Sequence, residues 1–307
     1  MSIVVPVYNG ANSVGRLVDA IAGLQISGGH EMVLVNDGSP DNSLQVCLEL
    51  AKRRDLPVTV VNLARNFGEH NAVMAGLAHA RGDYIITMDD DLQNPPHEVK
   101  RLFEFARDRQ LDAVYSYYEV KEHAAWRNLG SRFTNWCADV LLDKPKGLYL
   151  SSFRCISAFV AEQVLNYAGP YPYIDGLVMQ VTRNIDRLKV EHLPRADGSS
   201  NYTIRRLIRL WMAMFLNFSV MPLRIATLAG LAIGALGLLA LLYIVGEAVI
   251  DSRAPRGYPS LMAAVLVVGG MQLVMLGVIG EYLGRLYLTT NRKPQYIVRD
   301  VTRPPEG

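Results

Sequence analysis

The stretch YIITMDDDLQNPP, from Tyr84 to Pro96, decides how this chain is interpreted. A short apolar run follows Gly82-Asp83, leads directly into three consecutive carboxylates and is stopped by two prolines. Short apolar runs bounded by such breakers are typical of buried strands rather than helices. We therefore predict a strand that ends in an acidic turn at residues 89–91.

Side chains alternate between the two faces of a strand, so Asp89 and Asp91 are predicted on one side and Asp90 on the other. Two converging carboxylates repel each other unless a cation lies between them. Oxygen ligands suit Mg²⁺ or Mn²⁺, and the oxygens of a diphosphate would complete an octahedron. The alternative is a solvated acidic turn. We expect no catalytic role for Asp90, because it faces away.

Strands and helices alternate along the first third of the chain. Strand-like runs begin at Ser2, Glu31, Val58 and Tyr84. Helical spacing follows them in turn: at 11–24, in the segment that ends at residue 51, at 71–79 and at 97–109. This alternation predicts βαβ units and a mostly parallel sheet, in which ligands bind beyond the carboxyl ends of the strands. Four side chains just after predicted strands should therefore share one cleft: Tyr8, Asp37, Arg65 and Asp89.

The middle of the chain completes this domain. We predict a strand at 112–117, a mobile loop at 118–132 that enters a helix near Trp126, a strand that opens at Ser152, and a helix that starts at Asp175.

Two uncharged runs point to a membrane. Half of the 307 residues are apolar and only 20% are charged, and segments 225–245 and 259–280 contain no charged side chain. Each is about the ~20 residues that cross a bilayer as a helix. Segment 203–221 begins with arginines and continues with aromatic residues, which is typical of an interfacial helix. Basic residues flank the pair on both sides, so both flanks are predicted to be cytoplasmic.

The predicted organisation therefore has four parts. They are a cytoplasmic catalytic domain at 1–200, a juxtamembrane amphipathic helix at 201–222, two transmembrane helices within 223–281, and a cytoplasmic tail at 282–307. Glycines in both spans would permit close helix contact, although a glycine-rich hairpin can also be merely an anchor.

The net charge and the cysteine count exclude some classes of protein. The net charge is +2, and we find no basic, aromatic-interleaved patch that suggests nucleic acid. The three cysteines have no metal-binding spacing and are interpreted as reduced thiols. The chain starts with a strand and shows no signal peptide, so we expect the catalytic part to stay in the cytoplasm.

Taken together, five segments resemble family 2 glycosyltransferases of the GT-A fold. They are VPVYN at 5–9, NDGS at 36–39, NFG at 66–68 with 72–76, DDDLQNPP at 89–96, and the two-helix tail. Within that family the chain is similar to the membrane-anchored polyprenyl-phosphate glycosyltransferases, such as dolichyl-phosphate mannose synthases and GtrB-type enzymes. The resemblance implies an α/β, Rossmann-like nucleotide-sugar-binding domain followed by interfacial helices and a two-helix transmembrane hairpin.

The resemblance also implies residue roles on the donor side. Pro6 and Tyr8 would line the nucleobase pocket, the alternative being ordinary core packing. Asp37 would accept hydrogen bonds from the base or ribose, the alternative being that it only closes its turn.

Further roles concern the reacting groups. Asp89 would lie near the ribose and the metal, and Asp91 would ligate Mg²⁺ or Mn²⁺ directly. Gln93 would help to hold the sugar or diphosphate, or simply cap the following turn. Arg127 and Arg132 match positions that grip the acceptor phosphate in relatives, and an arginine fork suits phosphate oxygens. Solvated surface charge is the alternative for both.

One position departs from the family pattern. Ser152 stands where several relatives carry an acidic residue before a Phe-Arg pair. A hydroxyl acceptor needs a base, whereas a phosphate with a second pKa near ~6 is already largely ionised at neutral pH. The serine is therefore compatible with a lipid-phosphate acceptor, and Asp175 remains a possible base for a hydroxyl. Arg195, Ser200 and Tyr202 echo a segment that lies beside the active site in relatives.

The function expected from these residues is inverting, metal-dependent sugar transfer from a nucleotide-diphosphate sugar, UDP-linked by expectation, to a polyprenyl (undecaprenyl) phosphate. The expected location is the cytoplasmic face of the bacterial inner membrane, with a multi-pass anchor, and relatives imply a tetramer. The alternatives are transfer to another lipid or glycan hydroxyl, and a non-catalytic membrane subunit for translocation of lipid-linked sugars.

Overall fold

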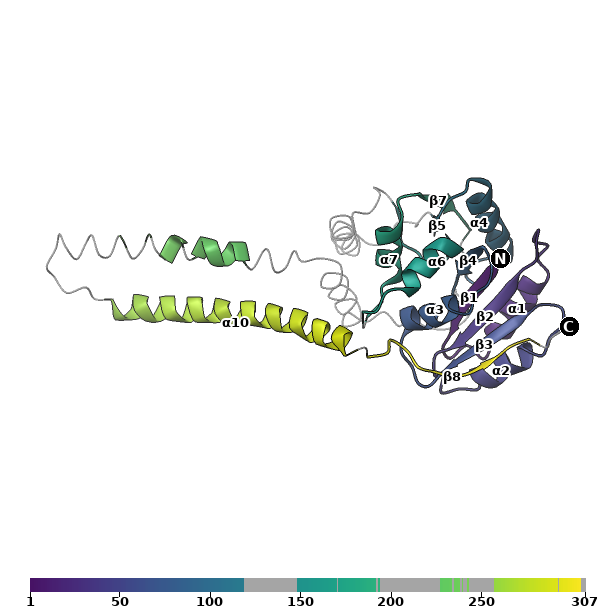
Figure 1. Ribbon diagram of the computed structural model, residues 1–307, viewed down its shortest axis with the longest axis horizontal. Coiled ribbons are helices and arrows are strands. Elements are labelled where there is room, and N and C mark those ends of the chain that lie inside the picture. The colour runs from purple at the N-terminus through teal and green to yellow at the C-terminus, as the bar shows by residue number, and fades with distance from the viewer. Residues whose placement is uncertain are drawn as a thin grey trace. The chain divides into compact units, whose positions relative to one another are not determined.

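The computed structural model describes residues 1–118, 148–169, 171–191, 193, most of 227–242, 257–291 and 293–304. The chain divides into two compact units (Figure 1). The first comprises Met1–Met214 together with Arg292–Gly307, and the second comprises Phe215–Asn291. The predicted interfacial helix at 201–222 lies outside the described residues.

The first unit is built on one eight-stranded sheet with the order β7-β5-β6-β4-β1-β2-β3-β8. The strands are β1 (Ser2–Val7), β2 (Glu31–Asn36), β3 (Val58–Leu63), β4 (Tyr84–Thr87), β5 (Ala113–Tyr117), β6 (Arg154–Ser157), β7 (Ile185–Lys189) and β8 (Val298–Thr302). The four N-terminal strands run parallel, as predicted. β6 is antiparallel to both of its neighbours, and β8 is antiparallel to β3.

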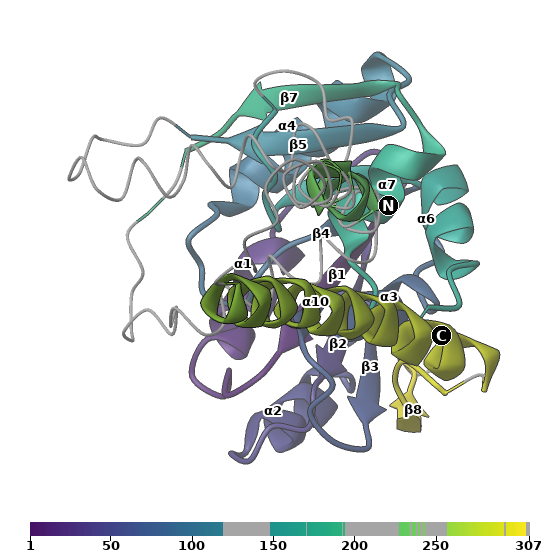
Figure 2. The same cartoon turned by 90° about the vertical axis from the view of Figure 1, so that its left-hand side faces the viewer.

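Helices cover both faces of this sheet (Figures 1 and 2). They are α1 (Val14–Ala22), α2 (Ser43–Leu50), α3 (Glu69–Leu77), α4 (Pro96–Asp108), α6 (Ala158–Leu165) and α7 (Ile174–Val181). The apolar sides of α1, α2 and α4 share one buried cluster with alternate strand residues such as Ile3, Val5 and Leu34. The intervening residues Val4 and Val35 face α3 on the other side. This alternation follows from the two-residue period of the strands.

The register of the parallel strands places the loops that follow them together. Val7 at the end of β1 pairs with Asn36 at the end of β2, which in turn pairs with Asn62 near the end of β3. The loops at 8–13, 37–42 and 64–68 therefore all leave the sheet on the side of the strands' carboxyl ends. The acidic turn after β4 joins them there, because β4 is parallel to β1.

The C-terminal strand β8 differs from the sequence prediction, which treats 282–307 as a tail. β8 pairs with the outer edge of β3, and the backbone N–H of Ala64 donates to the carbonyl of Ile297 at 2.9 Å. The Asn62 amide also donates to Asp300 at 3.2 Å. Val298, Val301 and Thr302 are β-branched and favour a strand, but the segment is short and carries two charges, and it is the pairing with β3 that places it in the sheet.

The second unit contains α10 (Tyr258–Thr290), a helix of 33 residues. Among the described residues, its portion Val267–Thr290 is long and apolar enough to cross a membrane, with a mean hydropathy of 1.5. The predicted second span at 259–280 falls on this helix, which continues about three turns further. Within the first predicted span, Thr227–Gly237 is a shorter apolar helix.

One of the predicted glycine contacts is present in this unit. A Cβ placed on Gly230 would lie 2.8 Å from the Met275 Cε of α10, so the two helices approach each other there. Added Cβ atoms on Gly237, Gly269, Gly270 and Gly277 would meet nothing within 4 Å in the described structure. Among the described residues, close helix contact is therefore present at Gly230, and no described residue supplies it at these four glycines.

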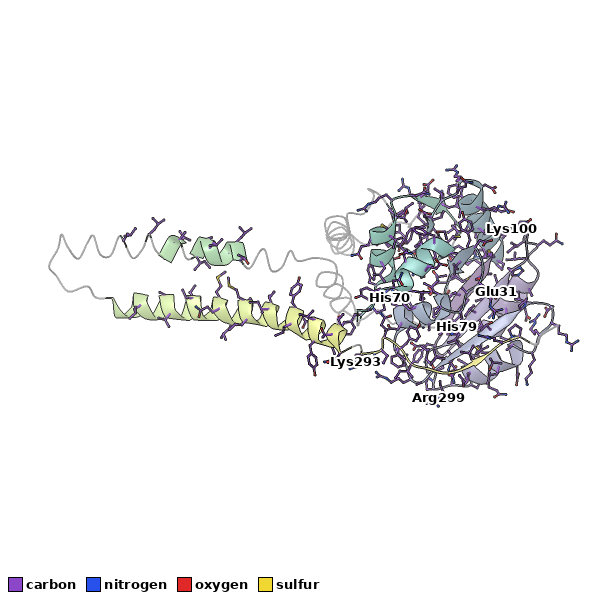
Figure 3. All side chains as sticks on the ribbon, viewed as in Figure 1. Glu31, His70, His79, Lys100, Lys293 and Arg299 are labelled. Atoms are coloured by element: carbon purple, nitrogen blue, oxygen red, sulfur yellow. The ribbon has the colours of Figure 1, made fainter. Side chains whose placement is uncertain are left out.

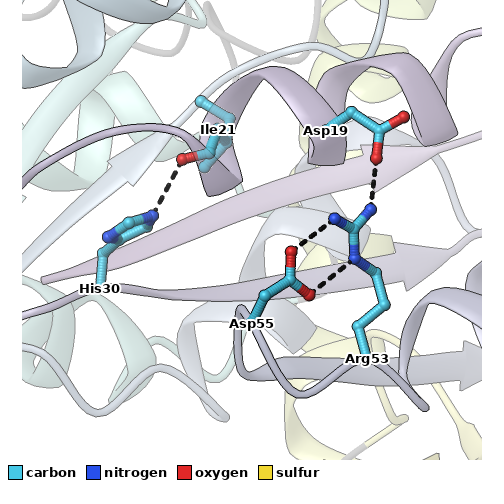
Figure 4. Close-up of polar contacts among 5 residues, drawn as sticks. All are labelled: Asp19, Ile21, His30, Arg53 and Asp55. Carbon is cyan, nitrogen blue, oxygen red and sulfur yellow. Dashed lines mark hydrogen bonds and ion pairs between the residues drawn. The ribbon is translucent and has the colours of Figure 1, made fainter.

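Polar contacts near the amino-terminal ends of the strands are structural (Figure 4). Arg53, in the loop between α2 and β3, donates to Asp55 at 2.9 and 2.6 Å and also pairs with Asp19 of α1. His30 contacts the carbonyl of Ile21 at 3.0 Å. Exposed ion pairs of this kind contribute little to stability.

Candidate active site

Asp89 opens the acidic turn and is held by the loop before β6. The Ser152 hydroxyl donates to Asp89 Oδ2 at 2.8 Å, and the Thr87 hydroxyl donates to the Ser152 carbonyl at 2.7 Å. Thr87 and Arg154 are register partners in β4 and β6, which explains why Ser152 lies opposite the turn. The Ser152 hydroxyl therefore orients Asp89.

The acidic turn concentrates negative charge. The pKa of Asp89 is raised to about 6, chiefly by burial and also by the charges of Glu69 and Asp91, while the Ser152 hydrogen bond acts in the opposite direction. Asp91 Oδ1 accepts from the Gln93 backbone N–H at 3.2 Å. Like charges in a buried site favour a bound cation.

The protein side chains alone supply only part of the ligands that a hard divalent cation needs. In the described segments, no group of three or more His, Cys, Asp or Glu side chains is placed to hold a metal. Asp89 and Asp91 can supply carboxylate oxygens, which Mg²⁺ and Mn²⁺ prefer. Since Mg²⁺ is usually bound by one or two carboxylates plus substrate phosphates, this pair fits a cation shared with a diphosphate.

Asp90 points away from this pair, as the strand alternation predicts. Its Oδ2 accepts from the Ser13 hydroxyl at 3.1 Å, beside the N-terminus of α1. The pKa of Asp90 is raised to about 6, chiefly by burial, with a further contribution from the charges of Asp89 and Asp91 and an opposing one from the Ser13 hydrogen bond.

Asp37 joins the loops after β2 and β3. Its two carboxylate oxygens accept from the backbone N–H groups of Phe67 and Gly68 at 2.7 and 2.9 Å. Gly38 has φ of +61°, and a Cβ there would lie 2.4 Å from the Arg65 carbonyl carbon, so the two loops are in close contact. Asp37 therefore does more than close its own turn, because it also holds the loop after β3.

Tyr8 lies at the end of β1 and is 49% exposed, which excludes core packing for its side chain. The following residue, Asn9, has φ of +57°, and its N–H donates to the Ser39 hydroxyl at 3.3 Å. Pro6 is half-buried within β1. An exposed aromatic ring beside Asp37's loop can serve as a wall for a planar ring.

Gln93 is held against the chain beyond β7. Its carbonyl accepts from the Leu193 N–H at 2.8 Å, and its side-chain amide donates to the Leu193 carbonyl at 3.3 Å. Gln93 therefore anchors the start of the segment that carries Arg195, Ser200 and Tyr202. Those three residues, and Arg127 and Arg132, lie outside the described residues.

A buried ion pair lies next to the acidic turn, and sequence reasoning missed it. Arg154 of β6 pairs with Asp175 in the first turn of α7, and the two side chains are 3% and 9% exposed. Arg154 also lowers the pKa of Asp89 through its charge. The Phe-Arg pair after Ser152 was the signal in the sequence, but its partner is 21 residues away.

His70 lies at the start of α3, beside the Arg154–Asp175 pair, and is labelled in Figure 3. Its ring contacts Tyr173 edge-on, with 5.2 Å between the ring centroids. Burial lowers the pKa of His70 to about 4. The ring is therefore neutral at pH 7 and packed in the core.

The fold and the site define a class. An α/β sheet with Asp-x-Asp at the carboxyl edge of its parallel strands is the GT-A arrangement of nucleotide-sugar-dependent glycosyltransferases.

The family follows from comparison with known proteins. Residues 2–161 match the model of Glycosyl transferase family 2, and residues 221–286 match that of the GtrB C-terminal hairpin. The chain belongs to Glycosyl transferase family 2.

Curated relatives match over nearly the full length. The undecaprenyl-phosphate 4-deoxy-4-formamido-L-arabinose transferase of Edwardsiella ictaluri is 33% identical, over 99% of this chain and 94% of that protein. The transferase of the same name from Yersinia pestis is 34% identical, over 98% of this chain and 93% of its own.

Two solved structures share the fold. TarS residues 1–349 of S. aureus in complex with UDP-GlcNAc has a TM-score of 0.50 and 19% identity, covering 71% of this chain and 67% of that one. Glucosyl-3-phosphoglycerate synthase of Mycobacterium tuberculosis, in complex with Mn²⁺, UDP-glucose and phosphoglyceric acid, also has a TM-score of 0.50, with 18% identity over 70% of this chain and 78% of that one.

Proposed function

We propose that this glycosyltransferase moves a sugar from a nucleoside-diphosphate sugar to undecaprenyl phosphate, with inversion, at the cytoplasmic face of the bacterial inner membrane. The observation that carries the proposal is the near-full-length similarity to transferases named for undecaprenyl phosphate. The Asp-x-Asp turn at the sheet edge supports the donor half of the reaction.

The donor would lie across the loops at the carboxyl edge of the sheet. Pro6 and Tyr8 would contact the base, and Asp37 would accept hydrogen bonds from the base or ribose. UDP is the nucleotide to test first. Asp89 and Asp91 would hold Mg²⁺ or Mn²⁺, which when bound offsets the charge of the leaving diphosphate. Ser152 would keep Asp89 oriented, and Gln93 would lie beside the sugar or diphosphate.

The acceptor side favours an already ionised nucleophile. Ser152 cannot replace a carboxylate base, and Asp175 is buried in an ion pair with Arg154. A phosphate needs no base, because it is largely ionised at neutral pH. Arg127 and Arg132 would grip that phosphate and align it with the anomeric carbon.

The chain connections support a hairpin in the membrane. The apolar unit Phe215–Asn291 is joined at both ends to the unit that contains the sheet, because β8 returns to β3. Both ends of the apolar unit must then leave the membrane on the same side, which requires an even number of crossings. We propose two crossings, with the helix at 201–222 on the surface, and a tetramer by analogy with relatives.

The acceptor half is tested by Arg132→Ala. We expect the apparent KM for undecaprenyl phosphate to rise and kcat to fall, together roughly 10- to 150-fold, because one charge-assisted bond is lost. Donor binding without lipid should not change. Arg54→Ala is the control, since Arg54 is an exposed arginine near the opposite edge of the sheet. Normal kinetics for Arg132→Ala would remove this residue from the acceptor site.

The second candidate, transfer to a hydroxyl, requires a base, and Asp175 is the residue to test. Asp175→Asn leaves Arg154 without its partner, so its melting temperature has to be measured alongside its activity. A folded but inactive Asp175→Asn, together with normal Arg132→Ala, would favour the hydroxyl acceptor.

A further inference from the structure

The middle carboxylate of the acidic turn lies against the loop between β1 and α1, residues 8–13. Asp90 Oδ2 accepts from the Ser13 hydroxyl at 3.1 Å. The same oxygen lies 1.8 Å from the position that a Cβ on Gly10 would occupy, and Asp90 Cγ lies 3.1 Å from it. The Asp90 side chain therefore fills the space that a side chain at residue 10 would need.

Gly10 and Asp90 are complementary. Carbon and oxygen atoms do not approach within 1.8 Å without a bond, so an alanine at residue 10 must displace the carboxylate. The Val7 Cγ1 atom lies 3.0 Å from the same position and closes the other side. The half-buried carboxylate of Asp90 is tolerated there because Ser13 supplies a hydrogen bond.

The loop at 8–13 is also tied to the loop after β2. The N–H groups of Asn9 and Gly10 donate to the hydroxyls of Ser39 and Ser43, at 3.3 and 2.9 Å. These bonds fix the loop relative to Asp37. The Ser13–Asp90 bond fixes it relative to Asp89 and Asp91 on the neighbouring turn.

We infer that Asp90 is a positioning residue for the nucleotide-sugar donor, and that the missing side chain at Gly10 makes room for it. Tyr8 lies on the loop that Asp90 holds, and Asp89 and Asp91 flank Asp90 on the turn. Under the proposed function, on which this inference rests, these groups bind opposite ends of one donor. The distance between Tyr8 and the Asp89–Asp91 turn determines whether the protein can contact both the base and the diphosphate of one donor.

Asp90→Ala tests this role directly. We expect the KM for the donor, and the Kd for UDP with Mn²⁺, to rise about ten-fold, the effect of one charge-assisted hydrogen bond. The KM for undecaprenyl phosphate and kcat at saturating donor should stay within about two-fold, because Asp90 touches no reacting atom. Asp90→Asn should restore donor affinity, since its amide oxygen still accepts from Ser13.

The contact with Gly10 is tested by a double-mutant cycle. Gly10→Ala alone should weaken UDP binding, because its methyl group displaces the carboxylate. In the Asp90→Ala background, the same substitution should have almost no further effect on UDP binding or on the melting temperature. Additive effects would show that the two residues do not share this space.

The outcomes separate the inference from the proposed function. If the wild type binds UDP and Asp90→Ala binds it equally well, the inference is wrong and the proposed function stands. A general loss in Asp90→Ala, with kcat and both KM values impaired in proportion to a lower melting temperature, would also overturn it by showing a merely structural role. If the wild type binds none of UDP, GDP, ADP and TDP with Mn²⁺, the proposed function itself fails.

Discussion

At the scale of single residues, the acidic side chains at the sheet edge perform different tasks. Asp37 holds backbone N–H groups of the neighbouring loop, Asp90 holds a serine hydroxyl, and Asp89 accepts from Ser152. Asp91 bonds to its own turn. These carboxylates join the loop after β2 to the loop after β3, and the acidic turn to the loops after β1 and before β6.

His70 should make stability depend on pH. Its pKa is about 4 in the fold against 6.5 when unperturbed, so between these values the unfolded chain binds one more proton. The contribution of His70 to the free energy of unfolding is therefore complete above pH 6.5. It is lost progressively as the pH drops towards 4, by up to about 3 kcal/mol.

His70→Phe keeps the ring contact with Tyr173 and removes the titration. When the pH is lowered from 7 to 5, the melting temperature of the wild type should decrease relative to that of this variant. The half-buried carboxyl groups of Asp89 and Asp90 act in the opposite direction, since their pKa is raised in the folded protein. Their contribution cancels when the two proteins are compared. Equal shifts would contradict a buried, neutral His70.

The sequence predicted which acids face each other, but not what else they contact. Alternation along a strand placed Asp90 opposite Asp89 and Asp91, and the Ser13 contact confirms that direction. The partners of Asp37 and Arg154 are 30 and 21 residues away. Such pairs depend on how loops and strands meet, which local patterns do not encode.

At the scale of elements, the strands with apolar runs could be predicted and the polar ones could not. β1 to β5 follow runs of buried valine, isoleucine and similar residues, and the predicted bounds agree within a few residues. β7 and β8, with the sequences IDRLK and VRDVT, lie at the two edges of the sheet. An edge strand buries less of its surface, so its sequence carries a weaker signal.

The segment between α10 and β8 also holds the loop that precedes α7. The Gln295 side-chain amide donates to the carbonyls of Tyr167 and Gly169 at 2.6 and 2.8 Å. Gln295→Ala leaves these carbonyls without this donor, at a cost of about 1 kcal/mol per bond. Hydrogen exchange at 166–175 should then be roughly five- to thirty-fold faster.

Arg299→Ala is the matched control, since Arg299 lies in β8 and donates to the Ala64 carbonyl instead. It should leave exchange at 166–175 unchanged. Slow exchange there in Gln295→Ala would show that the loop is held by its other contacts.

At the scale of the whole molecule, the sheet is completed only after the chain has passed through the apolar unit. The even number of crossings inferred from this connection predicts that a tag in the 252–257 loop reacts with a membrane-impermeant reagent added from the periplasm. A tag after Gly307 should react only in permeabilised cells. The reverse pattern would contradict a cytoplasmic donor site.

The most direct test of the central claim is sugar transfer by the purified protein in lipid nanodiscs. Radiolabelled UDP-sugars would be offered with either undecaprenyl phosphate or undecaprenol, with Mn²⁺ or with EDTA, and Asp91→Asn would be the inactive control. We expect label in undecaprenyl phosphate with Mn²⁺ only, and none with EDTA or in Asp91→Asn. Transfer to undecaprenol, or transfer to the phosphate that survives both EDTA and Asp91→Asn, would contradict it.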